Sequence, residues 1–170
     1  MSYCVEYAYA NRKLMMTRTQ HVFSNFFPNI RFDDIINKAH NYAAWESHFG
    51  KNVVVHRKGA TSAREGEIGI IPGSQGTHSY IVEGLGNPDS FNSCSHGAGR
   101  AMGRKEAARN LRLEDEQRKL DAMDIIHAVK SQRDLDEAPS AYKNIHEVMA
   151  NQEDLVKIKV KLRPLTVVKD

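Results

Sequence analysis

The stretch PGSQGTHSYIVEGLGNPDSFNSCSHGAGRAMGR, residues 72–104, contains most of the glycine of this chain, and all 11 glycines lie between Gly50 and Gly103. Glycine lets the backbone approach a ligand closely or take a positive φ, so such a concentration indicates a built loop system rather than ordinary turns. Two loops of small residues stand out within it, PGSQG at residues 72–76 and SHGAGR at residues 95–100. The middle of the chain is therefore predicted to form closely spaced loops.

The second loop places His96 directly before Gly-Ala-Gly and Arg100. Backbone N–H groups beside a guanidinium bind anions such as phosphate, so the loop indicates a phosphate-handling site that contains a histidine. A neutral imidazole is a good nucleophile near pH 7 when one ring nitrogen is held protonated. On the residues alone, a nucleophilic His96 and a His96 that only caps a tight glycine turn both stay open.

Several sequence motifs closely resemble those of the RtcB-type RNA ligases, which join 3′-phosphate and 5′-hydroxyl RNA ends. The matching motifs are SCSHGAGR (93–100), IPGSQGTHSYIV (71–82), GLGNPDSF (84–91), HNYA (40–43) and HRKGAT (56–61), and the penultimate residue Lys169 also matches. The resemblance is specific because several long motifs occur in the same order as in the family. It covers most of this chain and implies the C-terminal, guanylate-binding portion of a longer enzyme.

The resemblance implies a role for individual residues. His96 matches the position that becomes joined to GMP by a phosphoramidate bond, and His40 matches a manganese ligand. On the residues alone, a hydrogen-bonded core or turn histidine is the better interpretation of His40. The positions expected to contact GTP or GMP are Asn41, Pro72, Gly73, Ser74, Gln75, Ser79, His96, Gly97, Ala98, Gly99 and Lys169. Within this set, Gly73 and Ser74 are expected to offer exposed amides and a hydroxyl; on the residues alone, a simple turn that ends the preceding strand is an equally good interpretation of the Pro72–Gln75 loop and Ser79. Asp170 ends the chain where glycine is common in the family, which puts a carboxylate beside Lys169.

The remaining metal ligands of the family come from a Cys- and Asp-containing motif and from glycine-rich histidine motifs. Residues 1–39 contain neither. A single histidine does not hold a divalent ion well, because such sites use three or more protein ligands. We therefore expect an N-terminal ligase fragment to supply the rest of the manganese site.

Basic residues beside the glycine-rich turns are candidates for RNA phosphate contacts. They are Lys58, Arg100 and Arg104. For Lys58, ordinary exposed surface charge is an equally good interpretation. The row Lys157, Lys159, Lys161 and Arg163 resembles a nucleic-acid stripe, but a solvated strand face whose lysines block unwanted strand pairing is the better interpretation.

The pattern of apolar residues predicts an α+β fold, with mixed strands and helices around glycine-rich nucleotide-binding loops, in one domain over residues 1–170. By resemblance this is an incomplete part of the RtcB fold. A first predicted helix covers 1–27, and one face of it carries Val5, Ala8, Met15, Val22 and Phe26. A second predicted helix covers 105–118. A third begins at Pro139 with Ser140 as its N-cap, and its inward-facing residues are Tyr142, Ile145, Val148 and Met149. Predicted strands cover 52–55, 68–71, 79–82 and 156–162, a short helix or turn covers 30–39, and a turn covers 57–61. Leu120, Met123, Ile126 and Val129 are expected to form an apolar stripe, and Trp45 and Cys94 to lie in the core.

The composition is compatible with a soluble, untargeted protein. The net charge of +3 fits a phosphate-bearing partner without being diagnostic, and no run of 18 apolar residues or basic-then-apolar leader occurs. Two cysteines, Cys4 and Cys94, do not make a disulfide framework, which indicates a reducing compartment. We expect a cytoplasmic protein with no membrane partner.

The function implied by the resemblance is a GTP-dependent RNA ligase that uses manganese. It joins an RNA 3′-phosphate or 2′,3′-cyclic phosphate to a 5′-hydroxyl end through a histidine–GMP intermediate, as in tRNA splicing or RNA repair. Its expected partners are RNA ends, GTP and the N-terminal ligase fragment. The alternative is a truncated, catalytically inactive nucleotide- or RNA-binding fragment, or one part of a split ligase. A core shared with an absent segment predicts exposed apolar surface and association.

Overall fold

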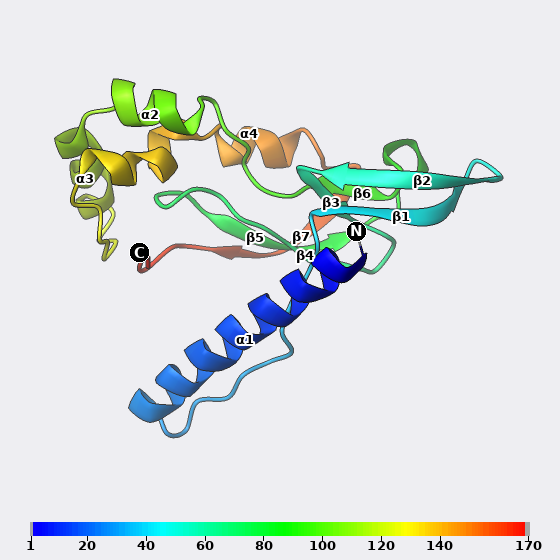
Figure 1. Ribbon diagram of the computed structural model, residues 1–170, viewed down its shortest axis with the longest axis horizontal. Coiled ribbons are helices and arrows are strands. Elements are labelled where there is room, and N and C mark those ends of the chain that lie inside the picture. The colour runs from blue at the N-terminus through cyan, green and yellow to red at the C-terminus, as the bar shows by residue number, and fades with distance from the viewer. Residues whose placement is uncertain (1, 169–170) are drawn as a thin grey trace. The chain divides into compact units, whose positions relative to one another are not determined.

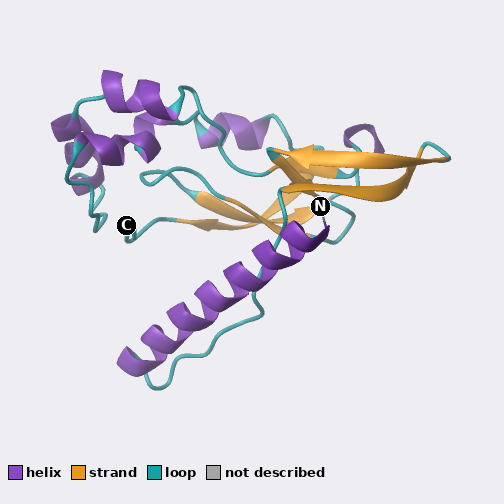
Figure 2. Cartoon of the chain, viewed as in Figure 1, coloured by secondary structure: helices purple, strands orange, loops and turns teal. Residues whose placement is uncertain are grey.

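The computed structural model describes residues 2–168 (Figure 1), and the chain divides into two compact units, Met1–Thr61 and Ser62–Asp170. Helices and antiparallel strand pairs are mixed without strict alternation (Figure 2), which confirms the predicted α+β class. The expected single domain stays a prediction, and each unit is described by itself.

The first unit consists of a helix, an irregular segment and a hairpin. Helix α1 (Ser2–Phe26) is followed by a segment that Asn37 ties to it, since Asn37 accepts a hydrogen bond from Arg12 Nε at 2.7 Å and donates one to the Tyr9 carbonyl at 3.2 Å. Strands β1 (Asn41–His48) and β2 (Lys51–Lys58) pair antiparallel. The two residues between them, Phe49 and Gly50, both have positive φ, 52° and 71°, as a two-residue hairpin turn of type I′ requires.

Several expectations for this unit are wrong. Residues 30–39 form no helix, β1 has no counterpart among the predicted strands, and residues 57–61 lie in β2, a bend at Gly59 and β3 (Ala60–Ser62) rather than in one turn. Trp45 is 78% exposed instead of buried, and Val54 of β2 is 42% exposed. Helix α1 has the predicted extent but no buried residue, so its apolar face makes no core.

The second unit is built on a three-stranded sheet with the order β4-β5-β7, formed by Ile68–Ile71, Ser79–Gly84 and Val156–Leu162. All three strands were predicted. Residues Ile71, Tyr80 and Val82 of the sheet are buried together with Ile145 and Met149 of helix α4 (Ile145–Ala150). Cys94 of the short strand β6 (Ser93–Ser95) joins this core, as predicted.

The helical part of the second unit surrounds a second apolar cluster. Helices α2 (Arg104–Asn110) and α3 (Leu113–Asp121) replace the single helix predicted over 105–118, because Leu111 takes an extended conformation that ends α2. Short 3₁₀ turns complete the unit at Pro88–Ser90, Gln132–Glu137 and Pro139–Ala141. The cluster consists of Leu120, Ile125, Val129, Leu135 and Ala138.

Two details of this part were predicted wrongly. The stripe from Leu120 to Val129 is broken, since α3 ends at Asp121 and Ile126 is left 75% exposed. Asn144, not Ser140, caps the helix that carries Ile145, by accepting a hydrogen bond from the His146 N–H at 3.0 Å. Ser140 instead donates to the carboxylate of Glu116 at 2.7 Å. Ile145 and Met149 are buried as expected.

Strand β7 contains a bulge that changes which of its side chains share a face. Ile81 is opposite Val160, but Val82 is opposite Ile158, so Lys159 is the extra residue. Directly opposed residues project to the same face of a sheet, so Lys161 shares a face with Tyr80, whereas Lys157 shares the other face with Glu83. The continuous alternation predicted for this strand is therefore wrong. As expected for a lysine-rich strand, β7 lies at a sheet edge.

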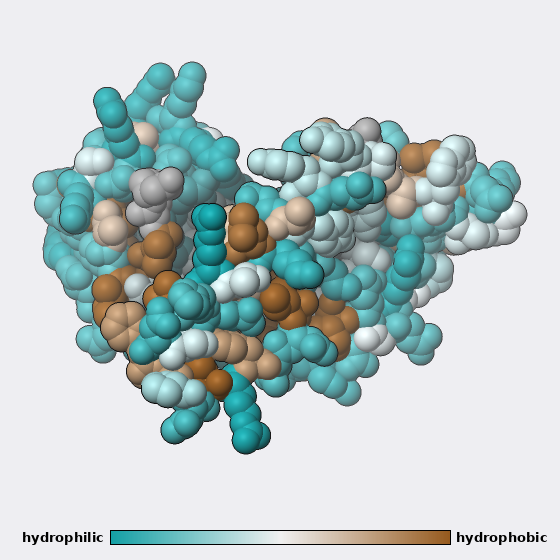
Figure 3. Space-filling view, turned by 60° about the horizontal axis from the view of Figure 1, so that its bottom comes forward, coloured by the Kyte–Doolittle hydropathy of each residue, from teal (hydrophilic) through white to brown (hydrophobic). Residues whose placement is uncertain are grey.

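Apolar side chains reach the surface in both units (Figure 3). Helix α1 exposes Leu14, Met15 and Phe26, and the sheet exposes Ile70 and Val160, each by 39% or more. None of the helices formed by residues 2–168 is long and apolar enough to cross a membrane.

Candidate functional site

Hydroxyl groups shape the first glycine-containing loop from within. The Gly73 N–H donates to Ser79 Oγ at 3.2 Å, and the Ser74 N–H donates to Thr77 Oγ1 at 2.7 Å. A Cβ on Gly73 would lie 2.2 Å from the carbonyl oxygen of His78, so only glycine fits this position. The two amides that were expected to be exposed to a nucleotide thus have partners inside the loop, and Ser79 supports the loop.

The second loop lies directly against the first. The Ala98 N–H donates to the Pro72 carbonyl at 2.9 Å, and a Cβ on Gly97 would lie 3.1 Å from the same oxygen. Gly99, with φ of 71°, accepts a hydrogen bond from the Lys143 N–H at 3.0 Å. The two loops singled out in the sequence are therefore brought together by backbone contacts.

His96 is half-buried at the start of the second loop, and the backbone on both sides of it is fixed. The Ser95 N–H donates to Gln152 Oε1 at 3.0 Å, and Ser95 Oγ donates to the Gly97 carbonyl at 2.5 Å. Because Ser95 and Gly97 flank the histidine, these bonds set the direction in which its side chain leaves the chain. A positioned imidazole beside a glycine-rich loop is what nucleophilic attack on a phosphoryl group requires.

The first loop also borders a pocket of about 350 Å³. Its lining consists of Gly73, Ser74, Gln75, Glu137, Tyr142, Val167 and Val168. The Oε1 atom of Gln75 is buried and accepts no hydrogen bond from residues 2–168, which leaves an acceptor for a ligand N–H group. An aromatic ring and aliphatic side chains beside such an acceptor suit a planar heterocycle. Lys169, which follows Val168, lies outside the described residues.

Arg100 supports the wall of this pocket. Its guanidinium lies 5.0 Å from the ring centroid of Tyr142, 3.3 Å from a Glu137 carboxylate oxygen, and donates to the carbonyls of Met102 and Asp136. Its donors are therefore directed into the chain, and its predicted contact with RNA phosphate stays a prediction that these bonds do not favour.

Glu137 and Tyr142 form a polar pair at the pocket. Burial alone would raise the pKa of Glu137, but the hydrogen bonds from Tyr142 and Arg104 and the nearby positive charges hold the pKa below its ordinary value. Burial and the hydrogen bond to Glu137 raise the pKa of Tyr142. At neutral pH the pocket therefore contains one carboxylate and one neutral phenol.

Arg104 lies on the exposed start of α2, where it donates to Glu137 at 2.9 Å and remains 69% exposed. With Lys105 and Arg109 it lines an open basic hollow of about 710 Å³. Arg104 therefore remains accessible to an RNA phosphate, and this contact stays a prediction.

The other predicted site residues belong to the first unit. Asn41 opens β1 directly opposite Lys58 of β2, and His40 precedes this pair; all three are exposed. Residues 2–168 contain no group of three or more His, Cys, Asp or Glu side chains that could hold a metal ion. The residues present therefore do not form a manganese site by themselves.

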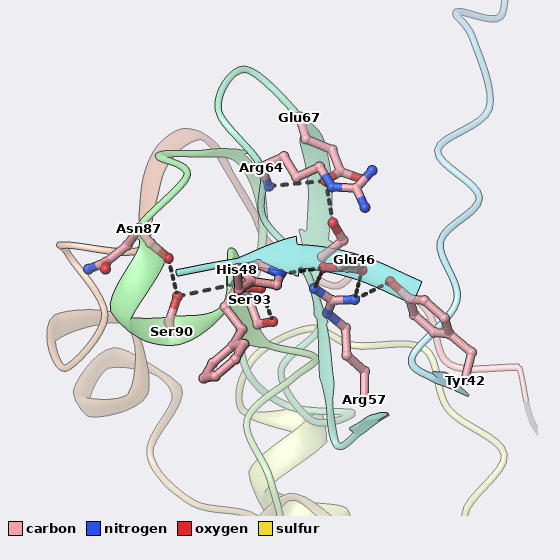
Figure 4. A network of polar contacts seen from close by, with 11 residues as sticks. Tyr42, Glu46, His48, Arg57, Arg64, Glu67, Asn87, Ser90 and Ser93 are labelled. Atoms are coloured by element: carbon pink, nitrogen blue, oxygen red, sulfur yellow. Dashed lines mark hydrogen bonds and ion pairs between the residues drawn. The ribbon is translucent and has the colours of Figure 1, made fainter. Parts of the chain in front are cut away.

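A buried ionic network in the hairpin escaped the sequence-based reasoning (Figure 4). Arg57 donates to the two carboxylate oxygens of Glu46 at 2.5 and 3.0 Å and to the Tyr42 hydroxyl at 3.1 Å, and His48 Nε2 lies 2.9 Å from Glu46. The Arg57 and Glu46 side chains are only 1% and 5% exposed. The hydrogen bond to Glu46 raises the pKa of Arg57. The even spacing of Tyr42, Glu46 and His48 was the available signal, since it places them on one face of a strand.

Comparisons with known proteins identify the family of this chain. The family model described as tRNA-splicing ligase RtcB matches residues 1–170. The chain is 51% identical over 134 residues to the RNA-splicing ligase RtcB of Escherichia coli strain K12, and equally to the RNA-splicing ligase RtcB1 of a second Escherichia coli strain. Each match covers 79% of this chain and 32% of the relative, so the chain spans about a third of the length of these relatives. The chain belongs to the tRNA-splicing ligase RtcB family.

Proposed function

We propose that this chain is the guanylate-binding part of a GTP-dependent RNA ligase and that His96 is its nucleophile. The observation that carries the proposal is the contact between the two glycine-containing loops: Ala98, two residues after His96, donates to the carbonyl of Pro72, which directly precedes the pocket residues Gly73, Ser74 and Gln75. Membership of the ligase family supports it.

In this proposal the pocket binds the guanine nucleotide. The Gln75 Oε1 atom accepts an N–H of the base, because it has no donor among residues 2–168. The ring of Tyr142 and the side chain of Val167 pack against the base and the ribose. Asn41 and Lys169, implied by resemblance, would complete the contacts.

The proposed reaction has three steps. A ring nitrogen of His96 attacks the α-phosphorus of GTP, a P–N bond forms, and pyrophosphate leaves as the P–O bond breaks. An oxygen of the RNA 3′-phosphate, present as such or derived from a 2′,3′-cyclic phosphate, then takes the guanylate and releases His96. The RNA 5′-hydroxyl finally attacks the activated phosphate, and GMP leaves as the new phosphodiester forms. Such ligation would serve tRNA splicing or RNA repair in the cytoplasm.

We also propose that His40 contributes one imidazole to a manganese ion. The rest of the metal site has to come from elsewhere, because the described residues supply no further cluster of ligands. This observation also favours a second candidate, in which the chain acts as one part of a split ligase or binds nucleotide and RNA without ligating them.

Nucleotide binding tests the pocket without requiring catalysis. We expect calorimetric titration to detect GMP binding, and a Gln75→Leu variant to bind GMP about fivefold to tenfold more weakly, since a hydrogen bond of this kind contributes about 1 to 1.5 kcal/mol. Gln20→Leu on α1 is the matched control and should bind like the parent chain. Equal GMP affinity in the parent chain and in Gln75→Leu would contradict the assignment of the pocket.

A further inference from the structure

Two histidines stand side by side in the second unit, next to the nucleotide loop. The ring centroids of His78 and His146 are 5.5 Å apart, and the Tyr80 hydroxyl is hydrogen-bonded to His146 Nδ1 at 2.9 Å. Tyr80 is only 3% exposed, so it anchors the His146 ring to the core while His146 itself remains exposed at the start of α4. The histidine pair is thus a fixed feature of the surface.

The bulge in β7 brings two permanent charges to this pair. Because Lys159 is the extra residue, Lys161 lies opposite Tyr80 and on the same face of the sheet. Arg163, two residues further on, donates to the Met123 carbonyl at 3.3 Å with one of its nitrogens. Burial, followed by the charges of Lys161, His146 and Arg163, lowers the pKa of His78.

The cluster of His78, His146, Lys161 and Arg163 forms no ion pair with a carboxylate of residues 2–168. The neighbouring Lys159 differs, since its Nζ lies 2.8 Å from Glu83. Placing the permanent charges of Lys161 and Arg163 beside the histidine pair without a counter-charge costs free energy, and an anionic ligand with several oxygens would offset that cost. An ordinary solvated strand face would not require Lys161 to share one face of the sheet with Tyr80 and the histidine pair while Lys159 pairs with Glu83.

The position of the cluster indicates which anion it serves. The His78 carbonyl lies against Gly73, and the next residue, Ser79, accepts the Gly73 N–H, so the cluster continues directly from the nucleotide loop. The same loop contacts the loop of His96 through the hydrogen bond from the Ala98 N–H to the Pro72 carbonyl. We propose that His78, His146, Lys161 and Arg163 form a contact site for the phosphate backbone of the RNA substrate; this inference rests on the proposed ligase function.

Binding of a fluorescent single-stranded RNA oligonucleotide to the full 170-residue chain tests the site. The variant Lys161→Gln/Arg163→Gln should bind about tenfold more weakly, and the slope of log affinity against log salt should fall by about 1.4, or about 0.7 for each lost phosphate contact. The loss should be equal for oligo(U) and oligo(A), because phosphate contacts carry no sequence information.

The matched control is Lys157→Gln/Lys159→Gln, which removes the same charge from the same strand but leaves the cluster intact. It should keep its RNA affinity within about twofold of the parent chain. Equal losses in both double variants, no loss in either, or no RNA binding by the parent chain would overturn the inference. Titration with GMP separates the two proposals, since it needs no RNA. If the parent chain binds GMP and the variant Lys161→Gln/Arg163→Gln binds RNA as tightly as the parent chain, the RNA site is refuted and the nucleotide pocket is not.

Discussion

At the scale of single residues, the site depends on glycines at which two backbone segments approach closely. Gly73 packs its Cα against the backbone of His78, and Gly97 packs against Pro72. Loss of either glycine would separate backbone segments that hydrogen bonds hold together, namely Gly73 with Ser79 and Ala98 with Pro72. The glycine content of the central stretch therefore reflects close backbone approach as well as flexibility.

Replacement of Gly73 by alanine should damage both stability and nucleotide binding. The new Cβ would meet the His78 carbonyl at 2.2 Å and force the loop to move. We expect the free energy of unfolding to fall by about 1 to 3 kcal/mol, measured by urea denaturation, together with weaker GMP binding. Gly103→Ala is the control, because a Cβ there has no neighbour within 4 Å. Similar stability of the two variants would contradict the packing described for Gly73.

The histidine pair predicts a specific dependence of stability on pH. The pKa of His78 in the folded chain is lowered below its ordinary value of 6.5 by burial and by Lys161, His146 and Arg163, so protonation favours the unfolded state. The stabilising contribution is present above about pH 6.5 and is lost as the pH falls. Thermal melts from pH 7.5 to 5.5 should show this loss, and His78→Asn should reduce it. Bound RNA should offset this loss of stability at low pH. A parent chain whose melting temperature at pH 5.5 is unchanged by RNA would contradict the prediction.

At the scale of elements, the structures that depend on local sequence patterns could be predicted, and those that depend on contacts between distant residues could not. Strands β4, β5 and β7 and helix α1 were predictable because their apolar periodicity is local. Strand β1 was not, because Tyr42, Glu46 and His48 place polar groups on the face that Arg57 covers from β2. The meeting of the two loops was also invisible, since Pro72 and Ala98 are distant in sequence. The two loops could thus be identified from the sequence, but their packing and the pocket wall could not.

Glu116 gives a testable case of an element held by a buried carboxylate. It is 1% exposed on α3 and accepts hydrogen bonds from Lys119 Nζ at 2.6 Å and from the Ser140 N–H and hydroxyl at 3.2 and 2.7 Å. We expect Glu116→Gln to lower the free energy of unfolding at pH 7 by about 1 to 3 kcal/mol. Glu114→Gln, exposed on the same helix, should leave it nearly unchanged.

The difference between Glu116→Gln and the parent chain should shrink in acid. Burial alone would raise the pKa of Glu116, but the bonds from Lys119 and Ser140 lower it below its ordinary value. Its stabilising contribution is therefore present above about pH 4.5 and lost as the pH falls through the lowered pKa. A constant difference from pH 7 down to pH 3 would contradict this role of the ionised carboxylate.

At the scale of the whole molecule, the main unexplained feature is the exposed apolar surface, which is unfavourable in water. Helix α1 buries none of its residues, and packing is what normally stabilises a helix in a protein. The chain spans about a third of the length of the curated relatives that it matches. Surface of this kind favours association with other apolar surfaces.

Sedimentation velocity should therefore detect association of the purified chain at micromolar concentration. Phe26→Ser/Phe27→Ser, at positions that are 75% and 57% exposed, should shift the distribution towards monomer without lowering the melting temperature. Arg18→Ser/His21→Ser on the same helix is the matched polar control. A monodisperse monomer that melts cooperatively would contradict the prediction.

The most direct test of the central claim is covalent labelling of His96. The chain is incubated with α-labelled GTP and manganese, alone and with an N-terminal ligase fragment, beside His96→Ala and the control His21→Ala. We predict an acid-labile label that survives denaturation, is present in His21→Ala and absent from His96→Ala; dependence on the added fragment would identify a split ligase. No label under any condition, or a label that persists in His96→Ala, would contradict the assignment of His96 as the nucleophile.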